Sequence, residues 1–158
     1  MVDRHYRILT SCEILRAVIS TIAVGTDGSA TATEAVKHAA DLAQRLDAKL
    51  VLLSAFRDSG SKPSVAAGDV ELQWAASSSA RVRTILERAE EDLGRSGIEC
   101  ELRADEGDPA DVLTRLAAEC GADLLVIGNK GMKRRLLGSV PNAVTHKADC
   151  SVLVVKTT

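Results

Sequence analysis

A loop rich in glycine and basic residues is the part of this sequence whose residue types and spacing best suit chemistry. In DLLVIGNKGMKRRLLGSVPNAV, residues 123–144, an apolar run ends at Gly128, and Gly131 follows three positions later. Glycine can adopt positive φ and lets a ligand approach backbone N–H groups. Ser139 follows Gly138 where a helix is expected to begin, and a helix N-terminus favours an anion by about 0.3–1 kcal/mol at an exposed site. The loop also carries four cations, so it predicts a phosphate-binding site: Lys130, Lys133, Arg134 and Arg135.

A short polar turn, GTDGS at residues 25–29, is the second stretch with ligand-binding residue types. It carries Thr26 and Asp27 directly after an apolar run. The carboxylate of Asp27 can coordinate a phosphate-bound Mg²⁺, act as a base, or cap the following helix, and capping is the commonest role of such a residue. The glycine loop also has a purely structural interpretation, because glycines after a strand form plain turns and basic runs often form solvated faces.

Familiar nucleotide-binding and catalytic motifs do not match these stretches. A P-loop needs G-x-x-x-x-G-K-[ST], whereas the residue directly before Ser139 is Gly138 and not a lysine. The Rossmann fingerprint G-x-G-x-x-G belongs on the first strand-to-helix turn, where this chain has GTDGS. The histidines do not form a pair, because His38 is expected in mid-helix, His146 near a helix end and His5 in the N-terminal segment. We therefore assign no catalytic residue, and Asp27 is the only candidate base.

Composition and charge narrow the class of protein. Hydrophobic residues make up 46% of the 158 residues and aromatic residues 2%, so the core must consist of Val, Leu, Ile and Ala. The net charge of -2 gives no general attraction to nucleic acid or to an anionic membrane. No apolar run approaches the roughly 18 residues of a membrane span, and Glu13 and Arg16 interrupt the N-terminal apolar stretch. We expect a cytoplasmic protein with no nucleic-acid and no membrane partner.

The cysteines are expected to have no metal-binding role, since they lack C-x-x-C spacing and nearby histidines. Three of them lie in or beside apolar segments and are expected to be buried small hydrophobes of a reduced protein: Cys100, Cys120 and Cys150. No metal site is assigned among the residues of this chain.

Periodicity predicts the elements that must position the two loops. Residues 19–24, 49–56, 98–104, 123–128 and 150–156 read as strands, with helices between them. Ser29 and Asp108 are expected helix N-caps. This βα alternation predicts one parallel sheet with helices on both faces. Residues 19–158 are expected to form one domain behind a peripheral extension, residues 1–18, and the aperiodic residues 57–73 to be a lid or a disordered segment.

Together these residues resemble the universal stress protein family. ATP-binding members carry G-x2-G-x9-G-[ST] between the fourth strand and the fourth helix, and a Thr/Ser-Asp pair after the first strand. The resemblance covers about residues 19–156, and the runs LLGSVPNAV and CSVLVVK also look like the family's. The residues that match are Gly128, Gly131, Gly138 and Ser139 for the first pattern, and Thr26 and Asp27 for the second.

The resemblance implies an open five-stranded parallel α/β sheet of order 3-2-1-4-5, a Rossmann-like adenine nucleotide-binding fold. It also implies the place of each site residue. Thr26 and Asp27 would lie against the adenosine, and Ala55 would pack on the adenine. Ser139 and the N–H of Val140 would hold the phosphates. The remaining glycines would line the ribose and phosphate path: Gly128, Gly131 and Gly138.

The loop departs from the family in length. The family has nine residues between the second and third glycines, whereas here residues 132–137 leave six. Three missing residues remove up to about 10 Å of extended chain, so the loop must follow a tighter path. ATP is the ligand that the resemblance implies, with AMP or cAMP as a rival and Mg²⁺ as an accompanying ion.

Three functions remain open at this point. The first is an adenine nucleotide-binding regulatory protein of the stress response. The second is a slow ATP hydrolase, and the third is a nucleotide-free dimeric scaffold. The apolar C-terminal strand is expected at a sheet edge, where exposed strands invite pairing, and family members often dimerise through it. We expect a homodimer with residues 152–155 near its two-fold axis.

Overall fold

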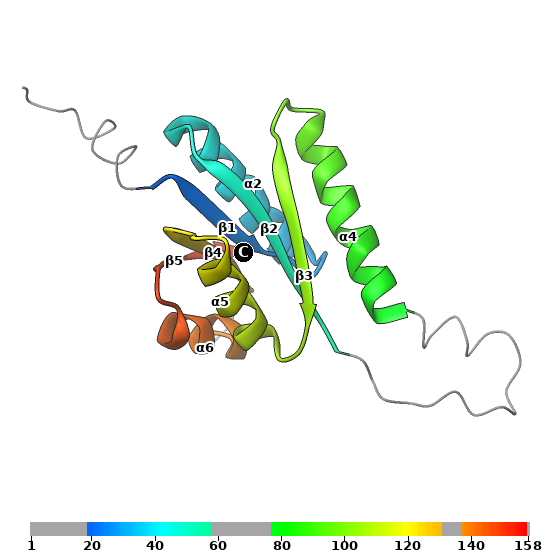
Figure 1. Cartoon of the computed structure of the whole chain (residues 1–158), viewed down its shortest axis with the longest axis vertical. Helices are drawn as coiled ribbons and strands as arrows, with labels where there is room; N and C mark the ends of the chain where they lie inside the picture. Colours follow the sequence, from blue (N-terminus) through cyan, green and yellow to red (C-terminus); the bar gives the residue numbers. More distant parts are fainter. Residues whose placement is uncertain (1–18, 58–76, 131–136, 158) are drawn as a thin grey trace, which may run out of the picture.

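Five strands and four helices alternate along the part of the chain that the structure describes. The computed structural model describes residues 19–57, 77–130 and 137–157. In chain order the elements are β1 (Thr21–Gly25), α2 (Ala30–Leu46), β2 (Lys49–Phe56), α4 (Ser77–Gly94), β3 (Cys100–Glu106), α5 (Pro109–Glu119), β4 (Leu124–Lys130), α6 (Ser139–Lys147) and β5 (Ser151–Thr157) (Figure 1). The extension 1–18 and nearly all of the aperiodic stretch 57–73 lie outside the described residues, so both of those predictions stay predictions.

The strands form one parallel sheet in the order β3-β2-β1-β4-β5. This confirms the predicted fold class and strand order. β1 lies between β2 and β4, so the direction of strand progression reverses at β1. Ligands of open α/β sheets bind outside the carboxyl ends of the strands at such a reversal. The turn after β1 and the carboxyl end of β4 are therefore neighbours at this end of the sheet.

Helices α2 and α5 begin at the N-caps that the local sequence predicts. Ser29 Oγ accepts the N–H of Ala32 at the start of α2, and Asp108 Oδ1 accepts the N–H of Ala110 at the start of α5. Pro109 occupies the first turn of α5, where its missing N–H costs nothing. Helix α4 begins at Ser77, five positions before the first apolar residue of its pattern, Val82. Both predicted caps are confirmed.

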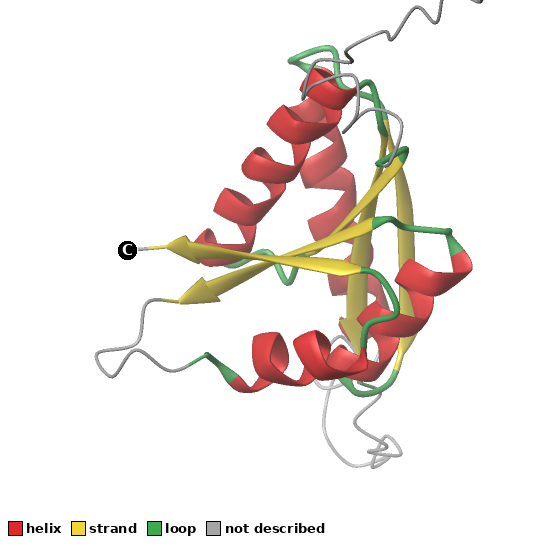
Figure 2. Cartoon of the chain, turned by 90° about the vertical axis from the view of Figure 1, so that its left-hand side faces the viewer, coloured by secondary structure: helices red, strands yellow, loops and turns green. Residues whose placement is uncertain are grey.

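The sheet is buried between two helical layers, α2 with α4 on one face and α5 with α6 on the other (Figure 2). The central strands β1, β2 and β4 are buried on both faces and read as continuous apolar runs for that reason. Valine, leucine, isoleucine and alanine supply the buried hydrophobic residues, as the composition requires. No helix within the described ranges is long and apolar enough to cross a membrane.

The cysteines are less buried than the sequence predicts. Cys100, Cys120 and Cys150 are free thiols of intermediate exposure. Each packs at the margin of one of the two cores and not inside it, because it lies at or near the N-terminal end of a strand or the C-terminal end of a helix. Desolvation by this partial burial raises the pKa of the Cys100 and Cys150 thiols, which favours their protonated form.

Candidate functional site

A cavity of about 800 Å³ lies at the carboxyl ends of β1 and β4. Seven of the eight residues singled out from sequence line it, although they come from four separate stretches of the chain. Gly131, the eighth, lies outside the described residues. The seven are Thr26, Asp27, Ala55, Gly128, Gly138, Ser139 and Val140. The strand reversal at β1 is what brings these stretches together.

One end of the cavity is apolar. Leu113 of α5 lines it, together with Ala55 of β2 and Pro109. A side chain on Gly25 would meet Leu113 at 3.0 Å, so this glycine makes room for the leucine at the edge of the cavity. Leu113 was not among the residues predicted from the sequence, because its spacing on a helix indicates only a buried core position. A flat apolar group such as a purine base fits a surface of this kind.

The turn after β1 is fixed by its own hydrogen bonds. Thr26 is buried, donates its backbone N–H to the Leu53 carbonyl and accepts the Ser54 hydroxyl on its own carbonyl. Asp27 is exposed, and its Oδ1 accepts the N–H of Ser29 at 2.9 Å. The carboxylate therefore closes the turn that leads into α2, which agrees with the capping role among the three considered for it.

Gly128 lacks a side chain for a reason that the sequence does not reveal. Glycine can adopt positive φ, but Gly128 is not among the described glycines that do so. Instead, a Cβ at this position would lie 2.7 Å from the carbonyl oxygen of Thr31 and 2.8 Å from its Cγ2. The first turn of α2 crosses β4 at this point, so packing alone requires glycine. Gly128 nevertheless lines the cavity.

At the start of helix α6, beside the cavity, two amides have no hydrogen-bond acceptor among the residues that the structure describes. The first four N–H groups of a helix lack intrahelical acceptors, and here these positions are residues 138–141. Gly138 has φ of -61°, and its N–H donates to Asn129 Oδ1 at 3.0 Å. Pro141 has no N–H. Only the amides of Ser139 and Val140 remain, beside the Ser139 hydroxyl.

The described lining of the cavity carries little side-chain charge. Asp27 is its one ionisable residue, and the first turns of both α2 and α6 reach it. Pro109, the first residue of α5, lines the cavity too, so the positive ends of three helix dipoles lie there and favour an anion. The loop cations Lys133, Arg134 and Arg135 lie outside the described residues, so the positive charge predicted from them stays a prediction. No cluster of metal-ligand residues occurs within the described ranges.

An ion pair lies beside the apolar end. The Arg57 guanidinium is 2.6 Å from Asp108, the residue that caps α5 just before Pro109. Partial desolvation raises the pKa of Asp108, but the hydrogen bonds from the Ala110 amide and from Arg57 outweigh it, so the pKa lies below its usual range. Asp108 stays ionised at neutral pH and holds the start of α5 in place.

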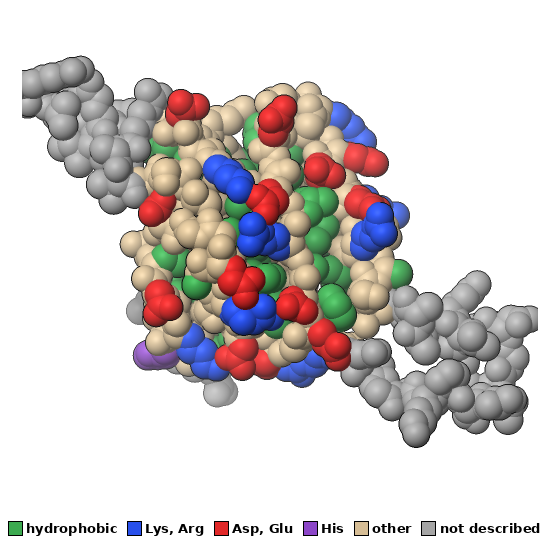
Figure 3. All heavy atoms as spheres, viewed as in Figure 1, with side chains coloured by type: hydrophobic (Ala, Val, Ile, Leu, Met, Phe, Trp, Pro, Cys, Tyr) green, Lys and Arg blue, Asp and Glu red, His purple; other side chains and the backbone are tan. Residues whose placement is uncertain are grey.

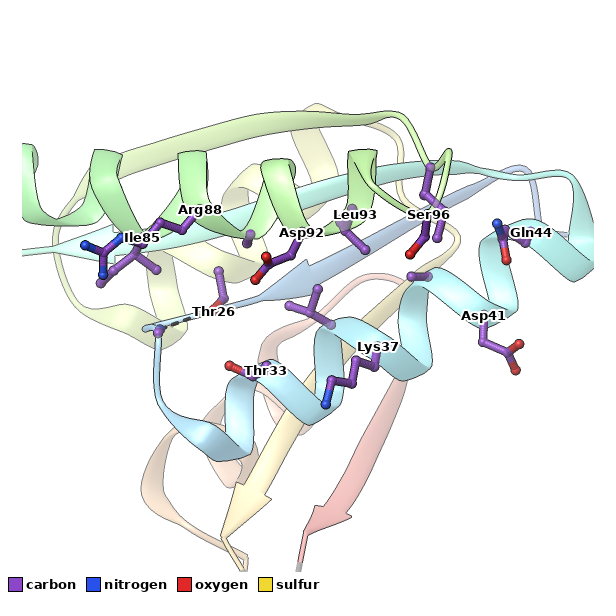
Figure 4. Close-up of a pocket in the computed structure, with 15 residues that line it drawn as sticks. Thr26, Thr33, Lys37, Asp41, Gln44, Ile85, Arg88, Asp92, Leu93 and Ser96 are labelled. Atoms are coloured by element: carbon purple, nitrogen blue, oxygen red, sulfur yellow. Dashed lines mark hydrogen bonds between the residues drawn. The ribbon is translucent and has the colours of Figure 1, made fainter.

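A second cavity, of about 550 Å³, lies between α2 and α4 (Figure 4). Alanines such as Ala40 and Ala89 leave this space between the two helices unfilled. Its rim carries both signs of charge, with Lys37 and Asp41 on α2 opposite Arg88 and Asp92 on α4. The two cavities share Thr26, but this one contains none of the helix-start amides. The first cavity is therefore the better candidate.

Comparison with known proteins identifies relatives along the whole domain. The family model described as the universal stress protein family matches residues 19–156. A universal stress protein of Mycobacterium tuberculosis strain H37Rv is 39% identical over 142 residues, which cover 87% of this chain and 97% of that protein.

Solved structures show the same fold. A universal stress protein crystallised in complex with cAMP is 30% identical, with a TM-score of 0.66 and coverage of 89% of this chain and 99% of that one. A family protein from Arabidopsis thaliana with AMP bound has a TM-score of 0.70 and covers 88% of this chain and 92% of its own. The two chains are 22% identical in sequence, so this likeness shows that they share a fold and nothing further.

Proposed function

This chain belongs to the universal stress protein family, and from that membership we propose that it binds an adenine nucleotide and acts as a nucleotide-responsive regulator of the stress response. The observation that carries the proposal is the single cavity that seven sequence-predicted residues line. The 30% identical relative that was crystallised with cAMP supports it.

The cavity suggests how the nucleotide lies. The adenine would pack between Ala55 and Leu113 at the apolar end, and the ribose would lie over the turn that holds Thr26 and Asp27. The phosphate would then reach the start of α6. Because β1 separates β2 from β4, the two ends lie about 10 Å apart, two strand spacings across the sheet. A nucleoside monophosphate spans such a distance.

The number of free donors bears on which nucleotide binds. The described part of the α6 start offers the amides of Ser139 and Val140 and one hydroxyl, which suit a single phosphate group. We therefore propose AMP or cAMP ahead of ATP as the ligand. A requirement for Mg²⁺ is not expected for a single phosphate, whereas ATP would bring the ion with it.

Titration calorimetry with AMP, cAMP and ATP tests this function. Ser139→Glu places a negative charge at the helix start and should abolish detectable AMP binding, while thermal unfolding shows an intact fold. Gly131→Leu tests the loop in the same way. Thr145→Glu, which adds the same charge to an exposed position of α6 away from the cavity, is the matched control. If the parent and Ser139→Glu bind AMP equally well, the assigned site is wrong.

A dimeric scaffold is the second candidate function, and the two sheet edges favour it. On the β3 edge, Glu101 pairs with Lys49 and Arg103, and Asp105 pairs with Arg115. Acidic and basic side chains alternate on the face seen in Figure 3. On the β5 edge, Leu153 is 37% exposed beside the half-buried Val152 and Val154. Charges protect one edge, and we propose that a second copy of the chain covers the other.

A further inference from the structure

One side-chain hydrogen bond joins the two ends of the shortened glycine loop. The carboxamide oxygen of Asn129, near the end of β4, accepts the backbone N–H of Gly138 at 3.0 Å, although the two residues are nine positions apart. Gly138 is the N-cap of α6, and it has no side-chain cap of its own. The residue that caps this helix start therefore lies on another element.

We propose that Asn129 is a positioning residue for the phosphate end of the site. This inference rests on the proposed adenine nucleotide function. Asn129 orients the start of α6, so the amides of Ser139 and Val140 are held in their direction before a ligand arrives. A binding site whose donors are already ordered binds its ligand more tightly, because no free energy is spent on ordering them when the ligand binds.

The hydrogen-bond inventory of the helix start carries the argument. The four N-terminal positions of α6 are residues 138–141. The N–H of Gly138 is bonded to Asn129, and Pro141 has no N–H. The next amide, that of Asn142, is already bonded to the Gly138 carbonyl. By accepting the Gly138 N–H, Asn129 leaves the amides of Ser139 and Val140 as the donors that a ligand can use. Without it, the partly buried N–H of Gly138 would lack its acceptor, and the start of α6 would lose the hydrogen bond that ties it to β4.

The position of Asn129 limits its effect to one part of the ligand. It lies on β4 and lines the cavity, whereas Ala55, at the apolar end, lies on β2 with β1 between them. Loss of the Asn129 carboxamide should therefore weaken binding of the phosphate and leave binding of the adenosine moiety unchanged. A residue that only stabilised the fold would affect both parts equally.

The test compares AMP with adenosine by titration calorimetry on the parent and on Asn129→Ala. A net hydrogen bond corresponds to roughly a threefold to tenfold change in affinity. We expect AMP affinity to fall by this factor and adenosine affinity to stay within twofold. The matched control is Asn142→Ala, the same change at an exposed side chain on α6, which should bind both ligands like the parent. An equal fall for AMP and adenosine, or no fall for either, overturns the proposal.

Amide hydrogen exchange of Gly138 in the ligand-free protein gives a second, ligand-independent readout. The amide should be protected in the parent and exchange faster in Asn129→Ala. Asn129→Asp keeps the acceptor oxygen, so it should restore the protection, but its charge should still weaken AMP binding. If the parent binds no adenine nucleotide, the proposed function fails, and Gly138 exchange still shows whether Asn129 holds the helix start. Unchanged exchange in Asn129→Ala overturns the inference alone.

Discussion

Gly128→Ala separates the two explanations for a glycine at the end of β4. An added Cβ would lie 2.7 Å from the Thr31 carbonyl oxygen and 3.1 Å from its carbon, which belong to the backbone of α2. Backbone atoms cannot rotate away as a side chain can, so strand and helix must separate by several tenths of an ångström. Overpacking of this kind costs about 1–3 kcal/mol.

The expected result is a lower melting temperature in the absence of ligand. For a domain of this size, about 1 kcal/mol shifts Tm by roughly 2–4 °C, so Gly128→Ala should melt about 4–8 °C below the parent for a central cost of about 2 kcal/mol. Differential scanning calorimetry of the ligand-free protein measures this directly. Added AMP should not remove the difference between the two proteins.

Gly138→Ala is the matched control, because both glycines line the same cavity. A Cβ at Gly138 would find its nearest neighbour, Asn129 Oδ1, at 3.5 Å, which is ordinary contact. Its φ of -61° and ψ of 166° suit alanine as well as glycine. The control should melt within about 2 °C of the parent, since the lower freedom of alanine in the unfolded chain opposes its weaker preference for an N-cap position. If Gly128→Ala melts within 1 °C of the parent, the packing explanation is refuted.

The remaining predictions concern three other groups. Asp123 Oδ2 accepts the N–H groups of Ser20 and Thr21, which lowers the pKa of this carboxyl below its usual 3.8. Its stabilisation is therefore present above pH 3.8 and is lost as the pH falls through the folded-state pKa. Asp123→Asn should lower Tm at pH 7, and the difference from the parent should shrink as the pH is lowered below 3.8. Leu153→Glu should convert a dimer into a monomer in light scattering, and a parent that is already monomeric at micromolar concentration would contradict the β5 interface. Asp27→Asn keeps the oxygen that accepts the Ser29 N–H, so it should fold normally and release phosphate from ATP no more slowly than the parent; a large loss would make Asp27 a catalytic base.

Much of the fold could be predicted because its signals are local. Apolar runs of strand length, helical spacing and the caps Ser29 and Asp108 each depend on a few neighbouring residues, and together they predict the βα order. The residues that line the candidate cavity were named from the family resemblance, and the strand order explains why they lie together. The part that could not be predicted concerns what each residue contacts. Gly128 was interpreted as a point of ligand approach, whereas α2 occupies the space where its side chain would be.

The sequence by itself determined which elements form, because periodicity, caps and short βα connections act within one stretch of chain. The strand order was an expectation from the family resemblance, because no local signal specifies which strands lie side by side. Only the tertiary structure decided that Asn129 on β4 caps α6, that Leu113 lines the apolar end, and that two amides of the α6 start find no acceptor within the described residues. These features depend on the distance between residues far apart in the chain, and packing of the whole sheet and its helices sets that distance.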